Sequence, residues 1–229
     1  RQRCGERITA FELISRNCLE LVLRHIPGTR DPLAGAHDWY VLAELGDSSP
    51  GGALREELEQ ALADALERQL AVDAAVAESR AQSQALWRMR ESIPEAARAE
   101  PGMVYRHDIA VAVSQVPAFI AEAGAALERR FPGAKVICFG HLGDGNLHYN
   151  AFIPGRQRSD SAARDAHDVA ETVYDIVQRY RGSFSAEHGI GLYKVEELRR
   201  YKSAVEVGLM RAIKRTLDPH GLMNPGKVL

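Results

Sequence analysis

Apolar and polar residues alternate along the chain in blocks that predict a succession of helices and strands. Apolar residues recur at helical spacing over 8–26, 53–70, 79–99, 116–131, 161–180, 193–200 and 204–217. This spacing predicts amphipathic helices that each bury one face. Shorter apolar runs lie at 39–45, at 105–113 and on both sides of Asp144-Gly145. These runs are typical of strands, and a short strand is also expected just before Glu187.

The two strands around Asp144-Gly145 are predicted to form a hairpin. Asp-Gly is the strongest short signal for a two-residue type I′ turn, in which both central residues need φ > 0. Such a turn places His141 directly opposite His148, with Cβ atoms about 4.5–5.5 Å apart on one face. Asn150 follows His148 by two residues and therefore points to the same face.

A hairpin makes the sheet at least partly antiparallel, so the sequence predicts an α+β fold. We expect a largely antiparallel sheet with helices packed on it and a helical segment at the C-terminal end. A dinucleotide-binding Rossmann fold is not supported, because no G-x-G-x-x-G segment follows a strand and opens a helix. Gly189-Ile190-Gly191 resembles only the opening of that motif.

Composition narrows the class of protein. A chain of 229 residues can bury a large core. Its net charge of −2, with scattered basic residues, does not favour binding to nucleic acid or to an anionic membrane. No apolar run reaches the roughly 18 residues of a transmembrane helix, and no signal-peptide pattern opens the chain.

Cys4, Cys18 and Cys138 are widely spaced and fit reduced thiols in a cytoplasmic protein. The start at Arg1, without methionine, suggests part of a longer protein.

The hairpin histidines have a candidate chemistry. Two imidazoles at this separation can converge on one metal ion, at about 2.0–2.1 Å each. Glu187 could complete a His, His, carboxylate ligand set with an open position for substrate. The neighbouring His188 would be a ready proton acceptor near neutral pH. Two other interpretations remain open: His141 and His148 are surface residues of a strand pair, or Glu187 lies at a helix N-terminus, where the macrodipole favours a carboxylate.

Several motifs occur together and in order over nearly the whole chain. They are Phe11-Glu12-Leu13-Ile14, Leu86 to Ser92, Arg106 to Ile109, Gly140 to Asn150, Ala186 to Gly191, and Leu217 to Leu229. This set resembles the C-terminal catalytic (cap) domain of FAD-linked oxidases of the vanillyl-alcohol oxidase type. The most similar members are D-2-hydroxyglutarate dehydrogenases, D-lactate dehydrogenases and glycolate oxidase D subunits. The resemblance covers 1–229 as one substrate-side domain with ferredoxin-like elements, without the family's N-terminal FAD-binding domain.

The resemblance implies a flavoenzyme that oxidises a D-2-hydroxy acid to the 2-oxo acid. It implies that His141, His148 and Glu187 bind a divalent metal ion, either zinc or manganese. It also implies that His188 is the catalytic base, which contacts the substrate and takes its hydroxyl proton. The electron acceptor and the side chain of the hydroxy acid are left open.

Further residues match the family one by one. Arg90, Arg106 and Asn150 match substrate-binding positions, and Asn224 matches an asparagine that lies near the flavin. For Arg90 the alternative is a solvated arginine on a helix face. Arg106 stands where relatives usually have lysine, so the geometry of carboxylate binding is expected to differ. Pro94 stands where some relatives have a substrate-contacting threonine, which weakens the assignment to hydroxyglutarate in particular.

Most FAD contacts are expected in the missing N-terminal domain, so this chain alone is predicted to be inactive. Its flavin-facing surface would be open to solvent or covered by a second copy, as in a homodimer. The alternative function is a metal-dependent hydrolase domain with the same His, His, Glu site, although no H-E-x-x-H or nucleophile motif is present. A non-catalytic binding domain is a third interpretation. Lys194 and Lys202 are expected to be plain surface charges.

Overall fold

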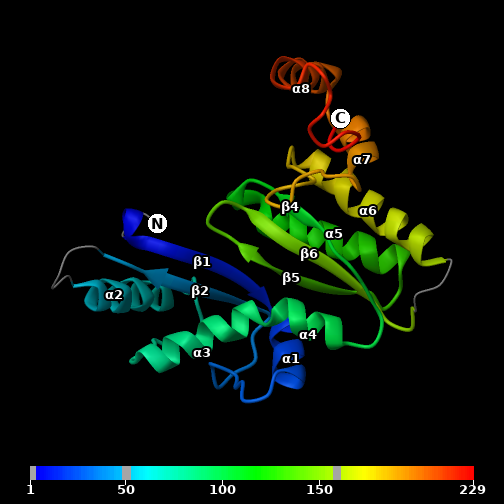
Figure 1. Ribbon diagram of the computed structural model, residues 1–229. Coiled ribbons are helices and arrows are strands. Elements are labelled where there is room, and N and C mark those ends of the chain that lie inside the picture. Colours follow the sequence, from blue (N-terminus) through cyan, green and yellow to red (C-terminus); the bar gives the residue numbers. More distant parts are fainter. Residues whose placement is uncertain (1–3, 48–52, 157–160) are drawn as a thin grey trace.

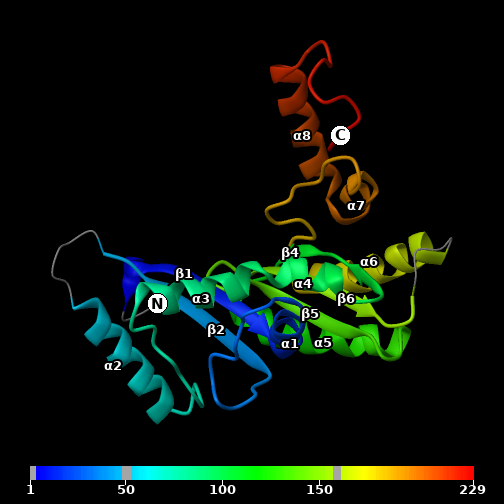
Figure 2. The same cartoon turned by 60° about the horizontal axis from the view of Figure 1, so that its bottom comes forward.

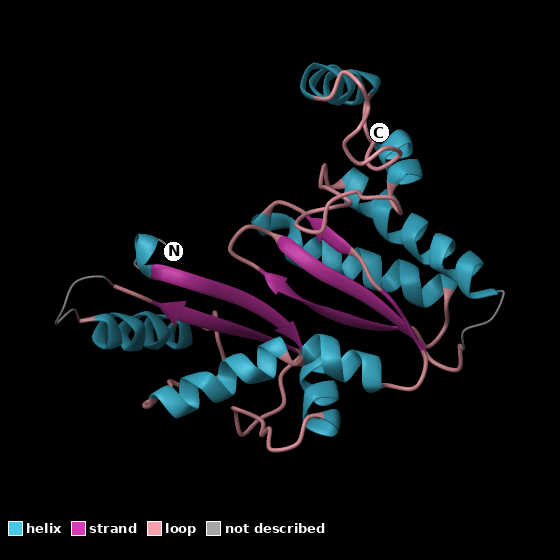
Figure 3. Cartoon of the chain, viewed as in Figure 1, coloured by secondary structure: helices cyan, strands magenta, loops and turns pink. Residues whose placement is uncertain are grey.

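An antiparallel sheet with helices on both faces forms the centre of the chain, which confirms the α+β prediction (Figures 1 and 3). The computed structural model describes residues 4–47, 53–156 and 161–229. The strands are β1 (Ile8–Ser15), β2 (Trp39–Leu45), β3 (Met103–Tyr105), β4 (Asp108–Ala110), β5 (Lys135–His141) and β6 (Asn146–Ile153). The helices are α1 (Arg16–His25), α2 (Leu54–Glu67), α3 (Arg80–Glu91), α4 (Ile93–Ala99), α5 (Val116–Arg130), α6 (Ser161–Arg179), α7 (Val195–Tyr201) and α8 (Ala204–Leu217).

The strands follow the order β2-β1-β5-β6-β3, and β4 also pairs with β6. Every pairing is antiparallel. Side chains therefore alternate between the two faces of the sheet with a period of two residues. Strand β6 lies between β5 on one side and the short strands β3 and β4 on the other, so it is the strand most enclosed by neighbours.

The helix predicted over 8–26 is wrong in its first half, which is strand β1. Leu13 packs into the core on one face of the sheet and Ile14 into the core on the other. A strand buried on both faces carries a continuous apolar run, which periodicity alone cannot distinguish from a helix. The strand predicted over 105–113 is divided into β3 and β4. Between them, the His107 carbonyl accepts the Tyr149 N–H, while the His107 N–H turns to the side chain of Asn150.

One face of the sheet packs against α5 and α6. The buried sheet residues on this face include Leu13, Cys138, Leu147, Tyr149 and Ala151. They meet Val116, Phe119, Ala123 and Leu127 of α5, and Val169, Val173, Ile176 and Val177 of α6. Both helices bury residues at three- and four-residue spacing, as expected for amphipathic helices on a sheet.

The second face packs against α1 and α4 over only part of its area. Its buried apolar residues from the sheet are Ile14, Ile137, Phe139 and Phe152. Figure 1 shows α1 and α4 near the C-terminal end of β1, away from the loop that joins β5 to β6. The part of this face nearer the loop carries polar side chains instead, and these form the candidate site.

The β5–β6 connection differs from the predicted two-residue turn. His141 pairs with Asn146, and His148 pairs with Phe139, so the loop has four residues, 142–145. Gly145 has φ +77°, but Asp144 is not among the residues with positive φ, so the turn is not type I′. Instead, the Asp144 N–H donates to the His141 carbonyl, and the Asp144 side chain accepts the Asn146 N–H at 3.0 Å. The register moves by two residues, which makes His141 and His148 diagonal neighbours that still share one face.

The C-terminal helices α7 and α8 stand away from the sheet (Figures 1 and 2). Val207 is the buried residue of α8, whereas Val205, Leu209, Ile213 and Leu217 are exposed. None of the described helices has the length and apolar character needed to span a bilayer.

Gly145 allows the loop to approach the segment after β4. A Cβ at Gly145 would lie 1.9 Å from the Val111 carbonyl oxygen, an overlap that only backbone movement could relieve. The Gly145 carbonyl accepts the Val111 N–H at 3.1 Å, so this close contact joins the hairpin loop to the chain beyond β4.

Gly145→Ala is expected to lower the free energy of unfolding by about 3 kcal/mol or more, because backbone strain adds to steric overlap. Gly133→Ala is the matched control, since Gly133 has φ +83° but a Cβ there meets nothing within 4 Å. The control is expected to cost about 1 kcal/mol. Urea unfolding of both variants measures the difference, and equal losses would show that the Val111 contact does not constrain the loop.

Candidate metal and substrate site

The candidate site is built on two adjacent cross-strand rows of the second face. One row contains Glu12, His141 and Asn146, and the next contains Phe139, His148 and Asp108. Because residues paired across antiparallel strands point to the same face, all six side chains lie on one side of the sheet. The topology therefore brings together residues that are more than a hundred positions apart in sequence.

Glu187 lies among three imidazoles. Its Oε1 is 3.2 Å from His148 Nε2 and 3.5 Å from His188 Nε2, and its Oε2 is 3.5 Å from His141 Nε2. The structure thus brings together the residues proposed from sequence as metal ligands and base. Glu187 lies in the loop between α6 and α7 and not at a helix N-terminus, so that alternative is wrong. The expected strand before it is a single bridge between Ser183 and Ala110.

Glu12 orients His141. Its Oε1 lies 2.7 Å from His141 Nδ1, and the Glu12 carboxylate is buried. In the neutral imidazole, Nδ1–H donates to Glu12, and the Nε2 lone pair is then directed at Glu187. A carboxylate that fixes a histidine tautomer in this way is the usual outer partner of a histidine that ligates a metal.

The surroundings of His148 favour its neutral form. Burial lowers its pKa, and the negative charge of Glu187 offsets this only in part. Its ring stacks on that of His188 at 5.4 Å between centroids, while the ring of His141 lies 5.9 Å away. In its Nε2–H tautomer His148 can donate to Glu187 Oε1, and in its Nδ1–H tautomer it presents a lone pair there, so a cation between the two groups would select the second tautomer.

Asp108 is a functional candidate that sequence reasoning missed. Burial alone would raise its pKa, but hydrogen bonds from the His188 amide, the Asn146 side chain and the Ala186 amide keep the pKa below its usual value. One potential donor atom from each of Asp108, His148, Glu187 and His188 lies within 4.8 Å of the others. The sequence around Asp108, Arg-His-Asp-Ile, has no spacing pattern that would have placed Asp108 next to the loop at 186–188.

Arg90 is buried, so the interpretation as a solvated helix-face arginine is wrong. Its Nε and Nη2 lie 2.8 and 2.7 Å from Glu12 Oε2, and its guanidinium lies 4.7 Å from the centre of the Phe139 ring. Glu12 therefore balances the charge of Arg90 and also orients His141. Sequence reasoning quoted Glu12 in a motif but gave it no role, because its partners lie on α3 and β5.

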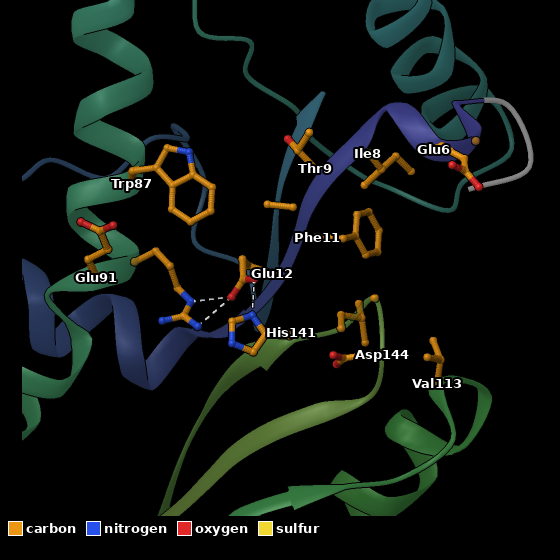
Figure 4. Close-up of a pocket in the computed structure, with 15 residues that line it drawn as sticks. Glu6, Ile8, Thr9, Phe11, Glu12, Trp87, Glu91, Val113, His141 and Asp144 are labelled. Carbon is orange, nitrogen blue, oxygen red and sulfur yellow. Dashed lines mark hydrogen bonds and ion pairs between the residues drawn. The ribbon is translucent and has the colours of Figure 1, made fainter. Parts of the chain in front are cut away.

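A groove of about 1140 Å³ opens beside this network (Figure 4). Its walls come from β1, α3 and the hairpin loop, with Phe11, Trp87 and Leu142 among the apolar lining residues. Glu12, Arg90 and His141 form its polar end. A mostly apolar groove with a few convergent polar groups is the usual form of a small-molecule site.

The other predicted site residues lie at the margin of this arrangement. Asn150 is buried, and its side-chain oxygen accepts the His107 N–H at 3.2 Å, so part of its hydrogen-bonding capacity is used structurally. Arg106 is exposed between β3 and β4. Asn224 is exposed in the C-terminal tail with φ +47°, and this tail is joined to the site loop by the Val228 N–H to Gly191 carbonyl bond at 2.7 Å.

Lys194 is not a plain surface charge, which corrects the expectation from sequence. Its Nζ donates to Ser185 Oγ at 3.1 Å and to the Phe184 carbonyl at 3.4 Å, and burial lowers its pKa. Lys202 forms an i, i+4 ion pair with Glu206 at the start of α8. Lys194 therefore supports the loop that carries Glu187.

The chain is similar to known proteins over nearly its whole length. Residues 1–228 match the family described as FAD linked oxidases, C-terminal domain, and the chain belongs to this family. It is 41% identical to a D-2-hydroxyglutarate dehydrogenase of Xanthomonas citri pv. viticola, over 99% of this chain and 47% of that protein. It is 37% identical to the mitochondrial D-2-hydroxyglutarate dehydrogenase of Arabidopsis thaliana, over 100% of this chain and 39% of that protein. A D-2-hydroxyglutarate dehydrogenase of Stutzerimonas stutzeri is 36% identical over 96% of this chain and 47% of its own length. The chain thus spans less than half the length of these relatives.

Beside the site, His107 is buried as a neutral imidazole. Burial lowers its pKa from 6.5 to about 4. Its Nδ1 lies 3.1 Å from the Tyr149 carbonyl, and its ring packs edge-on against Tyr174. His107 is therefore part of the core under α6, next to Asp108 in sequence.

The free energy of unfolding is expected to fall as the pH drops from about 6.5 to about 4, because the unfolded chain binds a proton at His107 that the folded chain does not. The contribution of His107 over this window is about 3 kcal/mol. His107→Gln is expected to show a correspondingly smaller loss between neutral and acidic pH, whatever its absolute stability. Urea unfolding at the two pH values tests this, with the exposed His220→Gln as control. An unchanged loss in His107→Gln would contradict the role of this histidine.

Proposed function

We propose that this chain is the substrate- and metal-binding half of a flavin-dependent dehydrogenase that oxidises a D-2-hydroxy acid to the 2-oxo acid. The observation that carries the proposal is the Glu187 carboxylate 3.2–3.5 Å from the Nε2 atoms of His141 and His148. Membership of the FAD-linked oxidase family and likeness to proteins named D-2-hydroxyglutarate dehydrogenase support the flavin and the substrate class.

The residues present suit a divalent metal ion. His141, His148 and Glu187 would supply two nitrogen ligands and one oxygen ligand, the set that catalytic zinc sites combine with an open position. Glu12 orients His141, and burial lowers the pKa of His148, so each ring can offer a nitrogen to a cation. Zinc and manganese both accept this ligand set.

When bound, the metal ion would polarise the substrate hydroxyl group and the flavin would accept the hydride from the substrate Cα. The hydroxyl proton would pass to Nε2 of His188. This atom lies 3.5 Å from Glu187 Oε1 and so faces the proposed metal ligands. The His188 side chain is 62% exposed, so substrate can reach it. The two electrons of the broken C–H bond would leave with the hydride, and loss of the hydroxyl proton to His188 would leave the carbon–oxygen double bond of the 2-oxo acid.

Arg90 is suited to bind or orient a substrate carboxylate from the end of the groove. Glu12 and Phe139 fix its guanidinium, so little side-chain entropy is lost on binding. Asn150 and Arg106 would contribute from the β6 and β3–β4 sides, and Asn224 from the tail toward FAD. The flavin is expected to be bound mainly by a domain outside this chain, so the chain alone would be inactive.

Joined to its flavin domain, the protein is expected to reduce an artificial electron acceptor with one or more of a panel of D-2-hydroxy acids. In that protein, His148→Ala should lose both metal and turnover, because a ligand is removed. His188→Ala should keep the metal but lose activity by about 10²–10⁴-fold, because a general base is removed. Metal analysis and steady-state kinetics measure both. Hydrolysis of an ester or amide without flavin reduction would favour the metal-dependent hydrolase instead, and full activity of His188→Ala would refute the assignment of the base.

Glu12→Gln is expected to weaken zinc binding by about 10–100-fold, the usual effect of losing an outer partner of a ligating histidine. The Gln amide group would donate to His141 Nδ1, so the ring proton would move to Nε2. Nε2 would then lack the lone pair that binds the metal. Competition against a chromophoric chelator measures the affinity, and near-UV circular dichroism checks that the fold is retained. Glu91→Gln, an exposed carboxylate on the same groove, is the control. Equal affinities of Glu12→Gln and the parent would show that Glu12 does not set the tautomer.

A further inference from the structure

The Glu187-His188 peptide is anchored by a carboxylate beneath it. Asp108 Oδ2 accepts the backbone N–H groups of Ala186 at 3.1 Å and of His188 at 2.8 Å. These are the amides on either side of Glu187. Asp108 Oδ1 accepts Nδ2 of Asn146 at 2.9 Å, which ties the same carboxylate to the hairpin. Asp108 is only 2% exposed, so these hydrogen bonds are formed out of contact with bulk water.

The rest of the loop is fixed from its other side. Ser183 exchanges two backbone hydrogen bonds with Ala110, at 2.8 and 2.9 Å, two residues beyond Asp108 on strand β4. Ser185 Oγ donates to the Gly189 carbonyl at 2.6 Å, and Lys194 donates to that hydroxyl group. The side chains of Glu187 and His188 are about half exposed, so the backbone of the loop has to set their direction.

A metal-ligand role for Asp108 fits the distances less well. The Asp108 oxygens already accept three N–H groups, which leaves about one of the four acceptor positions of a carboxylate. They lie 4.0 Å from His148 Nδ1 and 3.9 Å from His188 Nδ1, beyond hydrogen-bond distance. The nitrogens that face Glu187 are instead the Nε2 atoms, the other nitrogen of each ring.

We propose that Asp108 is a positioning residue that holds the metal ligand Glu187 and the base His188 in fixed relation to the hairpin, without itself binding the metal. This inference rests on the proposed function, since it assigns a support to the same site. Asp108 connects the two parts of the ligand set: β6, which carries His148, and the loop, which carries Glu187. Loss of this anchor would leave both halves folded but no longer aligned.

Asp108→Asn is the informative substitution. The NH₂ group of the new side chain would replace one of the two carboxylate oxygens. It would then face either the two backbone N–H groups or the Asn146 NH₂ group, so at least one donor would face another donor. Amide hydrogen exchange of the metal-free chain, read at His188, is expected to rise by about 10–100-fold, as for loss of a hydrogen bond to a charged acceptor, and less at Ala186, whose N–H also donates to the Asp108 carbonyl at 3.3 Å. Asp165→Asn, which changes a buried carboxylate on α6, should leave these amides unchanged. Unchanged exchange at His188 in Asp108→Asn would overturn the proposal.

Metal binding provides a second measurement. Zinc affinity of Asp108→Asn is expected to fall by about 10–100-fold, while the d–d absorption spectrum with Co²⁺ keeps the shape of the parent because the ligands are the same. A changed Co²⁺ spectrum would make Asp108 a ligand and overturn the proposal. Asp108→Glu keeps the charge but displaces the carboxylate by one methylene, so it should loosen the same amides to a smaller extent if Asp108→Asn does not fold. A parent chain that binds neither metal would refute the proposed function, whereas the exchange measurement would still decide whether Asp108 anchors the loop.

Discussion

The candidate site depends on one buried carboxylate, that of Glu12, which lies between a guanidinium and an imidazole. A carboxylate excluded from water is stable only if its charge is balanced and its oxygens are hydrogen-bonded. Arg90 supplies the charge at 2.7–2.8 Å, and His141 supplies the second partner at 2.7 Å. The position of α3 against the sheet, the orientation of the hairpin histidine and the polar end of the groove follow from this single arrangement.

The pairing of the strands determines where the remaining site residues lie. Antiparallel pairing directs side chains that share a row to the same face, so Glu12 and His141 meet although 129 positions separate them. The other face carries the larger hydrophobic core and packs against α5 and α6. Polar chemistry and hydrophobic packing therefore occupy alternate residues of the same strands, and a one-residue slip of register would exchange them.

Much of this could be read from the sequence, and the failures have physical causes. The helices of the second half, the hairpin strands and the proximity of His141, His148 and Glu187 follow from local patterns and motifs. The register of the hairpin could not be predicted in this way, because the close contact of Gly145 with Val111 favours a longer loop than Asp-Gly alone suggests. Strand β1 was predicted as helix because burial on both faces removes the alternation that identifies a strand. The roles of Glu12 and Asp108 depend on contacts with distant segments, which no local pattern records.

Helix α8 has a consequence for how the chain opens. It buries Val207 but leaves four apolar side chains of its outer surface in water, so few tertiary contacts hold it in place. A short helix without such contacts is marginal in water. Local unfolding begins where contacts are fewest, and its free energy can be far below that of the whole domain. We therefore expect α8 to open more easily than the body around the sheet, and a protease to cut within α8 before it reaches the strands that carry the site.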